Sequence, residues 1–261
     1  MSAFSNGPNM TGTVPIVGED VRLKNFVGPP AWELLHSAAR LYRPSTVTNI
    51  STISSKRTLI QRLLKCYTEL FCCERCQVHL RQKLRENPID AYLTSQENVF
   101  YYVYWLHDMV NSDINNHAGH TVKLSPSYQA IKVKYASIGD DTDPNVVSPA
   151  YQFGKSGWTV LHSFAVTYRR EKLEAMIEFL HVLGELFQSK AFQEYLEIYP
   201  PETYLENNQD AFLYTYLLHE LINHQINNEH GRIIKVSPSY HSLKNEYFLN
   251  LGGGQCKACS V

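Results

Sequence analysis

The stretch HDMVNSDINNHAGHTVKLSPSY at residues 107–128 recurs 112 residues later as HELINHQINNEHGRIIKVSPSY at residues 219–240. Both copies keep a histidine, an asparagine, an Asn-Asn pair, a glycine, a lysine and a final Ser-Pro-Ser-Tyr at the same spacing. Agreement at so many positions is not expected by chance, and self-similarity at one fixed offset indicates a duplicated structural unit. We therefore predict two homologous halves.

A second repeated stretch marks the beginning of each half. GPPAWELLHS at residues 28–37 recurs as GKSGWTVLHS at residues 154–163. Between the halves runs IGDDTDPNVVSP, which is acidic, polar and interrupted by prolines, as linkers commonly are. We divide the chain into a flexible leader (1–25), a first domain (26–137), a linker (138–151), a second domain (152–250) and a flexible tail (251–261).

The spacing of apolar residues within each half is helical. Four of them in the first half follow one helix face at i, i+4, i+7 and i+11, namely Val99, Val103, Leu106 and Val110. The expected helices are 29–42, 55–71, 73–86, 96–114 and 126–136, and then 155–169, 171–188, 189–198, 208–225 and 238–247. No persuasive alternating strand is found. The predicted fold is all-α, with two tandem bundles of four helices and a short fifth helix each.

Capping signals support the expected helix starts. Thr94 and Glu97 fit a capping box before the helix expected at 96–114. Ser125 and Pro126 fit an N-cap followed by proline at the first helical position, and residues 237–238 repeat this pair.

The composition excludes several classes of protein. Apolar residues make up 44% of the 261 residues and charged residues 19%, with a formal net charge of −1, which is ordinary for a globular chain. A near-neutral balance gives no basic footprint for nucleic acid. No apolar run approaches the ~20 residues that a membrane span needs. The N-terminus has neither the basic nor the apolar region of a secretory signal, so we expect no membrane partner and a cytoplasmic location.

The six cysteines lie in two clusters. The first holds Cys66, Cys72, Cys73 and Cys76, and the second holds Cys256 and Cys259 near the end of the chain. A stabilising disulfide framework is usually scattered through a secreted fold, whereas clustered cysteines in a reducing compartment are more often catalytic or metal-binding. Each cluster contains a CxxC, so a redox dithiol and a metal site are the two candidates.

Only one of the two halves keeps these thiols. When the Glu-Leu-Phe at residues 69–71 is aligned with that at residues 185–187, Cys73 falls opposite Ser189, Cys76 opposite Phe192 and His79 opposite Tyr195. The scaffold was duplicated, but the first CxxC belongs to the first half alone. We therefore expect the chemistry to reside in the first half.

The placement of the two pairs favours redox chemistry. Cys73 and Cys76 stand at the start of an expected helix, where the helix dipole and free N–H groups stabilise a thiolate, and Arg75 adds positive charge. Cys256 and Cys259 follow a Gly-Gly-Gly run that is typical of a flexible tether. A tethered dithiol that visits a fixed one would form a relay by thiol–disulfide exchange.

Three motifs in the first half together resemble the Erv/ALR family of FAD-dependent sulfhydryl oxidases. They are Gly-x-x-x-Trp-x-x-Leu-His at residues 28–36, CxxCxxH at residues 73–79, and His-x-x-Val-Asn at residues 107–111 with the following Lys123. The order, spacing and helical context of the motifs agree together. A chain with two such domains, of which one has lost its CxxC, is similar to forms of the family found in large DNA viruses. This resemblance implies a viral origin.

The resemblance implies a thiol oxidase that holds FAD in a helical bundle and forms disulfides in protein substrates. Cys76 would be the thiolate beside the flavin, Cys73 the interchange thiol, and Cys256 with Cys259 the shuttle; O2 would accept the electrons and yield hydrogen peroxide. The implied cofactor-binding residues are Gly28, Trp32, His36, Tyr42, His79, His107, Asn111, Lys123 and Tyr128. The second domain would take the place of the second subunit in the family's usual dimer, so that a single chain forms a pseudo-dimer. Such chains could also assemble into a higher oligomer.

Several alternatives stay open. The two CxxC pairs could together hold a structural zinc ion, since four thiolates suffice for a tetrahedral site. The tail pair could be incidental. The second half keeps Trp158, His162, His219, Asn223 and Lys235, so a flavin pocket could persist there, although we expect a structural role. Cys66 and Cys72 receive no assignment. Apart from the zinc alternative, no metal site is expected.

Overall fold

The computed structural model describes residues 18–44, 58–121, 123–138, 154–186 and 189–251. Every regular element within these ranges is helical, which confirms the predicted all-α class. None of the helices in the described ranges is long and apolar enough to cross a membrane. Most of the predicted linker and tail lies outside the described residues.

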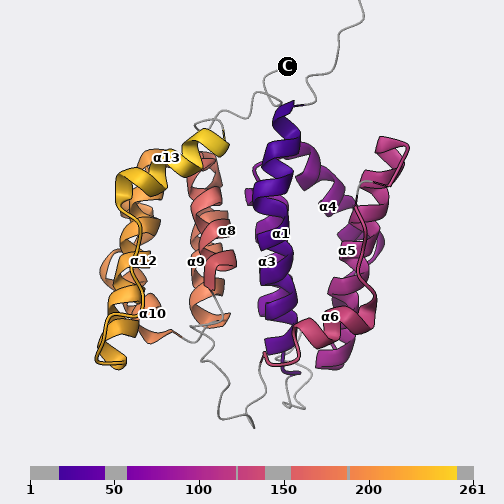
Figure 1. Ribbon diagram of the computed structural model, residues 1–261, viewed down its shortest axis with the longest axis horizontal. Helices are drawn as coiled ribbons and strands as arrows, with labels where there is room; N and C mark the ends of the chain where they lie inside the picture. The colour runs from indigo at the N-terminus through magenta and orange to yellow at the C-terminus, as the bar shows by residue number, and fades with distance from the viewer. Residues whose placement is uncertain (1–17, 45–57, 122, 139–153, 187–188, 252–261) are drawn as a thin grey trace, which may run out of the picture.

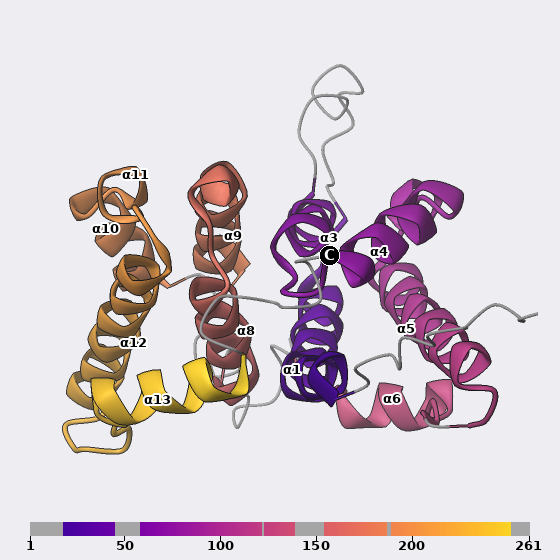
Figure 2. The same cartoon turned by 90° about the horizontal axis from the view of Figure 1, so that it is seen from above.

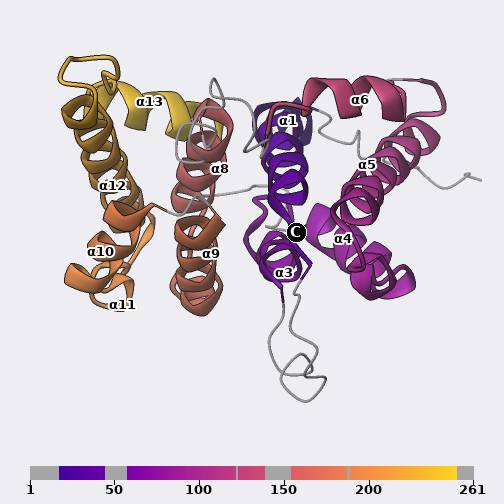
Figure 3. The ribbon, with the colours of Figure 1, turned by 90° about the horizontal axis from the view of Figure 1, so that it is seen from below.

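The helices of the two halves follow the same order, with an additional 3-10 helix, η2, in the described part of the second half. The first half contains α1 (Gly18–Leu41), α3 (Leu59–Leu70), α4 (Glu74–Glu86), the short 3-10 helix η1 (Ile89–Tyr92), α5 (Gln96–Ala118) and α6 (Tyr128–Lys134). The second contains α8 (Gly154–Val166), the 3-10 helix η2 (Arg170–Lys172), α9 (Leu173–Leu186), α10 (Lys190–Ile198), α11 (Pro201–Tyr204), α12 (Asn208–Glu229) and α13 (Tyr240–Asn250). In each half the last helix crosses one end of the bundle (Figure 3).

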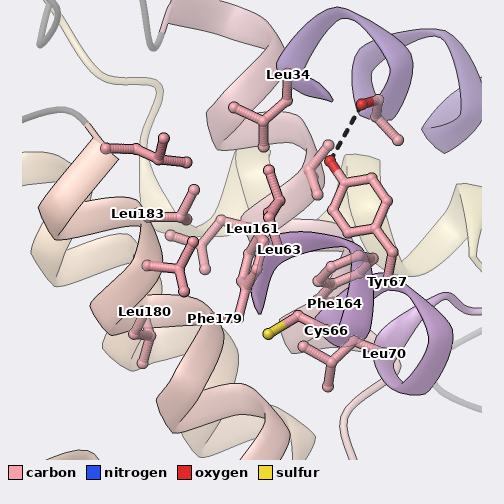
Figure 4. Packing of buried hydrophobic residues seen from close by; sticks show 14 of the residues in the cluster. Leu34, Leu63, Cys66, Tyr67, Leu70, Leu161, Phe164, Phe179, Leu180 and Leu183 are labelled. Carbon is pink, nitrogen blue, oxygen red and sulfur yellow. Dashed lines mark hydrogen bonds between the residues drawn. The ribbon is translucent and has the colours of Figure 1, made fainter. Parts of the chain in front are cut away.

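The halves lie side by side, with α1 and α3 facing α8 and α9 in the middle of the molecule (Figure 1). Leucine, cysteine and aromatic side chains of α3 pack against α9 there (Figure 4). The ring of Phe164 lies 5.7 Å from that of Tyr67 and 4.9 Å from that of Phe179, so aromatic contacts run from one half into the other. These contacts make one apolar core that spans both halves. Burial of such rings is a main source of folding free energy, so each half stabilises the other.

Charged contacts join the halves at the edges of this core. The guanidinium of Arg62 donates to the carboxylates of Glu178 and Glu185, at 2.6 and 2.9 Å. On the other side, Glu33 accepts from Lys134 of its own half at 3.0 Å and from the hydroxyl of Ser156 in the second half. These contacts fix how the two halves are aligned.

The first helix begins earlier than the sequence predicted. α1 starts at Gly18, so residues 18–25 are helical and do not belong to a leader; residues 1–17 lie outside the described part. The prediction placed the start beside Pro29 and Pro30, because proline lacks the N–H that an interior helical position donates. The helix instead continues through both prolines, whose fixed φ of about −65° suits a helix.

Three predicted caps are wrong, and side-chain contacts explain why. The N-cap of α5 is Ser95, whose Oγ accepts from the backbone N–H of Asn98, while the Thr94 hydroxyl is engaged by the Asn98 side chain. α6 begins after Ser127 and not after Ser125, because the Ser125 hydroxyl accepts a hydrogen bond from Asn111 at 3.1 Å. α13 begins after Ser239 and not after Ser237, because the Ser237 hydroxyl accepts a hydrogen bond from Asn223 at 2.6 Å.

The long helices α5 and α12 extend beyond their predicted ends. α5 stops at Gly119, which has a φ of 69°, and the glycine after α12, Gly231, has a φ of 60°. Glycine takes this left-handed conformation without steric strain, which ends a helix. The repeated glycine therefore marks the same helix end in both halves.

Candidate active site

The first half encloses a cavity of about 450 Å³. Its lining residues come from α1, α3, α4, α5 and α6, whose arrangement Figure 2 shows, and from Lys123, Leu124 and Pro126 before α6. This volume falls within the roughly 300–1,000 Å³ of small-molecule sites, which are largely apolar with a few polar groups. The cavity is therefore large enough to bind an organic ligand or a substantial part of one.

Most of the predicted site residues in the described ranges meet at this cavity. Its lining includes Gly28, Trp32, His36, Cys76, His79, His107, Asn111 and Lys123. They come from α1, α4, α5 and the segment before α6, so the fold joins all three sequence motifs.

Tyr42 and Tyr128 do not line this cavity, and their role in cofactor binding stays a prediction. The hydroxyl of Tyr42 donates to the carbonyl of Leu93, which ties the end of α1 to the loop before α5. The hydroxyl of Tyr128 donates to Glu97, and its ring packs against Tyr104. Both tyrosines hold neighbouring elements together through these contacts.

An aromatic cluster forms one wall of the cavity. The ring of His107 stacks on Trp32 with centroids 4.2 Å apart and planes at 11°. Nε2 of His36 lies 3.4 Å from Nδ1 of His107, so the two imidazoles share a hydrogen bond. His36 is 1% exposed, and its Nδ1 has no partner among the residues that the structure describes. The wall thus offers flat rings together with one unsatisfied polar atom.

Both imidazoles are neutral at physiological pH. The pKa of His36 is lowered to about 3, mainly by burial and in smaller part by the neighbouring charges of His107 and Lys134. Burial also lowers the pKa of His107 to about 4, although Asp108 acts in the opposite direction. Neutral imidazoles can each donate and accept one hydrogen bond, which suits the recognition of a polar ring edge.

The repeated asparagines hold the segment that closes the cavity on one side. Asn111 donates to the Ser125 hydroxyl at 3.1 Å. Asn115 donates to the carbonyl of Lys123 and accepts from its backbone N–H, both at 2.8 Å. These contacts bind residues 123–125 to α5, which explains why the asparagine, lysine and serine recur together in the sequence.

The dithiol is placed at the junction of α3 and α4. Cys73 and Cys76 form a disulfide, with their Cα atoms 5.2 Å apart, and Cys73 is the N-cap of α4. The side chain of Gln77 donates to the carbonyl of Phe71 at 2.6 Å, which secures this junction. The structure thus confirms that the dithiol stands at a helix start.

The two cysteines differ in their surroundings. Cys76 lines the cavity, whereas Cys73 is 3% exposed and lies behind it. The Sγ of Cys73 accepts the backbone N–H of Cys76 at 3.2 Å, and the N-terminus of a helix stabilises negative charge on such an atom. The pair therefore links a helix-capping sulfur to a cavity-facing one.

Sequence reasoning missed several residues of the cavity. Ile114 and His117 follow His107 along the same side of α5, and a helical spacing counted from His107 would have found them. Tyr135, whose ring stacks on His36 at 5.2 Å, lies beyond all three motifs and had no such signal.

The second half repeats the aromatic cluster. Trp158 stacks on His219 at 4.0 Å and 12°, and Nε2 of His162 lies 3.2 Å from Nδ1 of His219. Here Nδ1 of His162 has a partner, the hydroxyl of Thr215 at 3.1 Å, where the first half has Val103. The hydrogen bond left open in the first half is thus closed in the second.

Aromatic side chains stand where the first half has its cavity-facing residues. Phe192, the counterpart of Cys76, is 2% exposed and packs against Gly184. Tyr195, the counterpart of His79, places its ring 5.1 Å from that of Tyr214 on α12. α10 is therefore joined to α12 by direct ring contact.

The remaining cysteines fall into two groups. Cys66 and Cys72 are buried, and burial raises the pKa of the Cys66 thiol to about 12, which makes it a poor nucleophile. Cys256 and Cys259 lie outside the described residues, so neither the shuttle nor the zinc site is tested. Within the described ranges, no group of three or more histidine, cysteine or carboxylate side chains could hold a metal ion.

Comparison with known proteins gives one match. Residues 29–129 match the model of the Erv1/Alr family. The matched segment contains the cavity-lining residues of α4 and α5 and, except for Gly28, those of α1, and it supports Erv1/Alr membership. Neither a curated protein nor a solved structure matches the chain.

Proposed function

We propose that the chain is an FAD-dependent sulfhydryl oxidase that forms disulfides in protein substrates. The observation that carries this proposal is the position of Cys76, which belongs to a CxxC disulfide and lines a cavity walled by Trp32 and His107. The Erv1/Alr match supports an oxidoreductase role, since members of that family are FAD-linked sulfhydryl oxidases.

The residues of the cavity fit FAD. The stacked Trp32 and His107 offer flat faces for a ring system, and the open Nδ1 of His36 is a polar atom that a ligand or a water molecule can satisfy. Lys123 brings positive charge to the lining, which suits phosphate groups, whereas Lys83 there is paired with Asp113 at 3.0 Å. Bound there, FAD would supply a two-electron acceptor beside Cys76 and deliver the electrons to O2, giving hydrogen peroxide.

The chain's own chemistry is thiol–disulfide exchange. A substrate thiolate attacks the Sγ of Cys73, a substrate–Cys73 disulfide forms, and Cys76 leaves as a thiolate. A second substrate thiolate then attacks the substrate sulfur of that mixed disulfide. The products are an oxidised substrate and a Cys73–Cys76 dithiol that holds two electrons and, after protonation, two protons.

The substrate thiol must reach the sulfur of Cys73, which is buried. Because Cys73 is 3% exposed, a bulky protein thiol reaches it only if the first turn of α4 moves, whereas a small flexible dithiol needs less room. This difference supports a role for Cys256 and Cys259 as a shuttle that collects electrons from protein substrates.

We assign the second half a structural role. Phe192 and Tyr195 fill the places of Cys76 and His79, so we propose that this half holds no flavin and that the chain carries one FAD. Its contacts through α8 and α9 cover the apolar faces of α1 and α3, as a second subunit would. We propose this pseudo-dimer for the whole chain, and a viral, cytoplasmic setting remains a prediction.

Oxygen consumption tests the proposal. The purified chain should consume O2 and release hydrogen peroxide when it is supplied with dithiothreitol. If it is colourless, inert toward oxygen and contains zinc, the alternative of a structural zinc protein is correct.

A further inference from the structure

The outer face of α12 carries a row of exposed leucines. Leu213, Leu217 and Leu221 are 42%, 47% and 38% exposed, and their spacing of four residues places them along one side of the helix. α12 lies at the outer end of the second half, away from the first half (Figures 1 and 2). Single exposed leucines are common, but an aligned row is typical of a contact surface.

The neighbouring helices extend this apolar surface. Ile198 and Tyr199 at the end of α10 and Tyr204 in α11 are all exposed. The ring of Tyr204 lies 6.2 Å from that of Tyr214 on α12, which connects the two parts. We call these six exposed residues the α12 surface: Ile198, Tyr199, Tyr204, Leu213, Leu217 and Leu221.

Acidic residues accompany the α12 surface. Residues 190–229 contain seven acidic residues and one lysine, Lys190, which is paired with Glu194 at 3.1 Å. The corresponding residues 74–117 of the first half contain six acidic and four basic residues. The excess of acidic residues is therefore larger in this segment of the second half than in the first, although Glu206 is paired with Arg170 at 3.6 Å.

One carboxylate next to the leucines has an open hydrogen-bonding position. Glu220 precedes Leu221 on α12, and its Oε1 is buried without a hydrogen-bond partner among the described residues. A buried carboxylate oxygen without a donor is unfavourable, and rotation of the Glu220 side chain outward would allow a lysine or arginine of another molecule to satisfy it.

We propose that the α12 surface binds an amphipathic helix of a partner protein that carries aliphatic residues on one face and lysine or arginine at its margins. Such a helix places its apolar side chains against the leucine row and its cations beside the acidic residues. Charge argues against a second copy of this chain at the same face, because a symmetric contact would oppose two acidic surfaces. The proposal does not depend on the oxidase chemistry of the first half.

The test uses the full chain and two labelled helical peptides. Both peptides carry leucines at i and i+4; one has lysines at the other positions and the second has glutamates. Fluorescence anisotropy should show binding of the lysine peptide that weakens with added salt, and no binding of the glutamate peptide. Equal binding of both peptides, or of neither, would overturn the proposal.

Variants locate the binding face. Leu217→Ser with Leu221→Ser should weaken binding of the lysine peptide by at least about tenfold, and Glu220→Gln should weaken it less. Leu249→Ser, an 80% exposed leucine on α13, is the matched control and should change nothing. Circular dichroism of each variant checks the fold, and amide exchange with the bound peptide gives a second reading, in which protection should appear on α12.

Two results would reject the assignment. Unchanged affinity in the double leucine variant, together with no protection on α12, would exclude this face. If sedimentation shows a dimer that the leucine substitutions dissociate, the occupant is a second copy and not a basic partner.

Discussion

The backbone N–H of Cys76 donates to the Sγ of Cys73, 3.2 Å away, so the disulfide is built into the first turn of α4. This contact stabilises negative charge on Cys73, while Cys76 faces the cavity. The two sulfurs therefore have separate tasks in our proposal: Cys73 exchanges with substrate thiols and Cys76 communicates with the bound cofactor.

Cys76→Ser should abolish oxygen consumption with any dithiol, because the only cavity-lining sulfur of the disulfide is lost. An oxygen electrode with dithiothreitol measures this. Cys66→Ala is the control and should keep most of the activity, since that buried thiol lies at the interface of the halves. Substantial turnover by Cys76→Ser would remove Cys76 from the mechanism.

Replacement of both tail cysteines, Cys256→Ala and Cys259→Ala, should impair oxidation of a reduced protein more than oxidation of dithiothreitol. The buried Cys73 admits a small dithiol more easily than a folded protein. The ratio of the two rates is the measurement. Equal losses on both substrates would discredit the shuttle.

His107→Ala should weaken FAD binding by about tenfold, because it removes a ring stacked at 4.2 Å and a hydrogen bond to His36. Flavin content after gel filtration reports this directly. His219→Ala makes the same change in the second half and should leave the flavin content unaltered. An equal loss of flavin in both variants would mean that the second half also binds the cofactor.

The buried histidines predict lower stability in acid. Burial holds the pKa of His162 well below its usual value, so below pH of about 6.5 the unfolded chain binds a proton that the folded chain does not. Stability therefore falls as the pH drops below about 6.5, by up to ~1.4 kcal/mol per pH unit for each such histidine.

Denaturant titrations between pH 7 and pH 5 check this prediction. His162→Gln should reduce the dependence of the unfolding free energy on pH, even if it lowers stability at pH 7. His241→Gln, at an exposed position on α13, should leave the dependence as in the parent chain. If the slope of His162→Gln matches that of the parent, the histidine is not the source.

Arg62→Ala should destabilise the chain by about 1 kcal/mol, and the effect should shrink at high salt. Arg62 bridges Glu178 and Glu185 of the other half, and its side chain is more enclosed than theirs. Lys190→Ala removes an exposed pair within α10 and should have little effect on the melting temperature. Equal small effects would show that the bridge between the halves is dispensable.

The sequence predicted the helices and the meeting of the three motifs well, because both depend on local spacing and on repeated side-chain contacts. Asn111, Asn115 and Ser125 recur since they hold one segment against one helix. However, the recurrence of a residue in both halves does not show whether that residue serves helix packing or ligand binding. Tyr128 recurs as Tyr240, yet it joins helices outside the cavity.

Features that depend on tertiary packing could not be predicted. Nothing in the CxxC spacing says that Cys73 is buried and Cys76 is not, since this follows from how α4 lies against α3. The contribution of Tyr135 depends on where α6 crosses the bundle. The passage of α1 through two prolines likewise contradicts a local rule that holds for most helices.

The most direct test of the account is an absorption spectrum of the purified full-length chain, recorded before and after dithiothreitol in limited air. We predict flavin absorbance equal to one FAD per chain, which bleaches with the reductant and returns when air is admitted, and no bleaching in Cys76→Ser. A chain without flavin, or one whose flavin bleaches equally well in Cys76→Ser, would contradict the account.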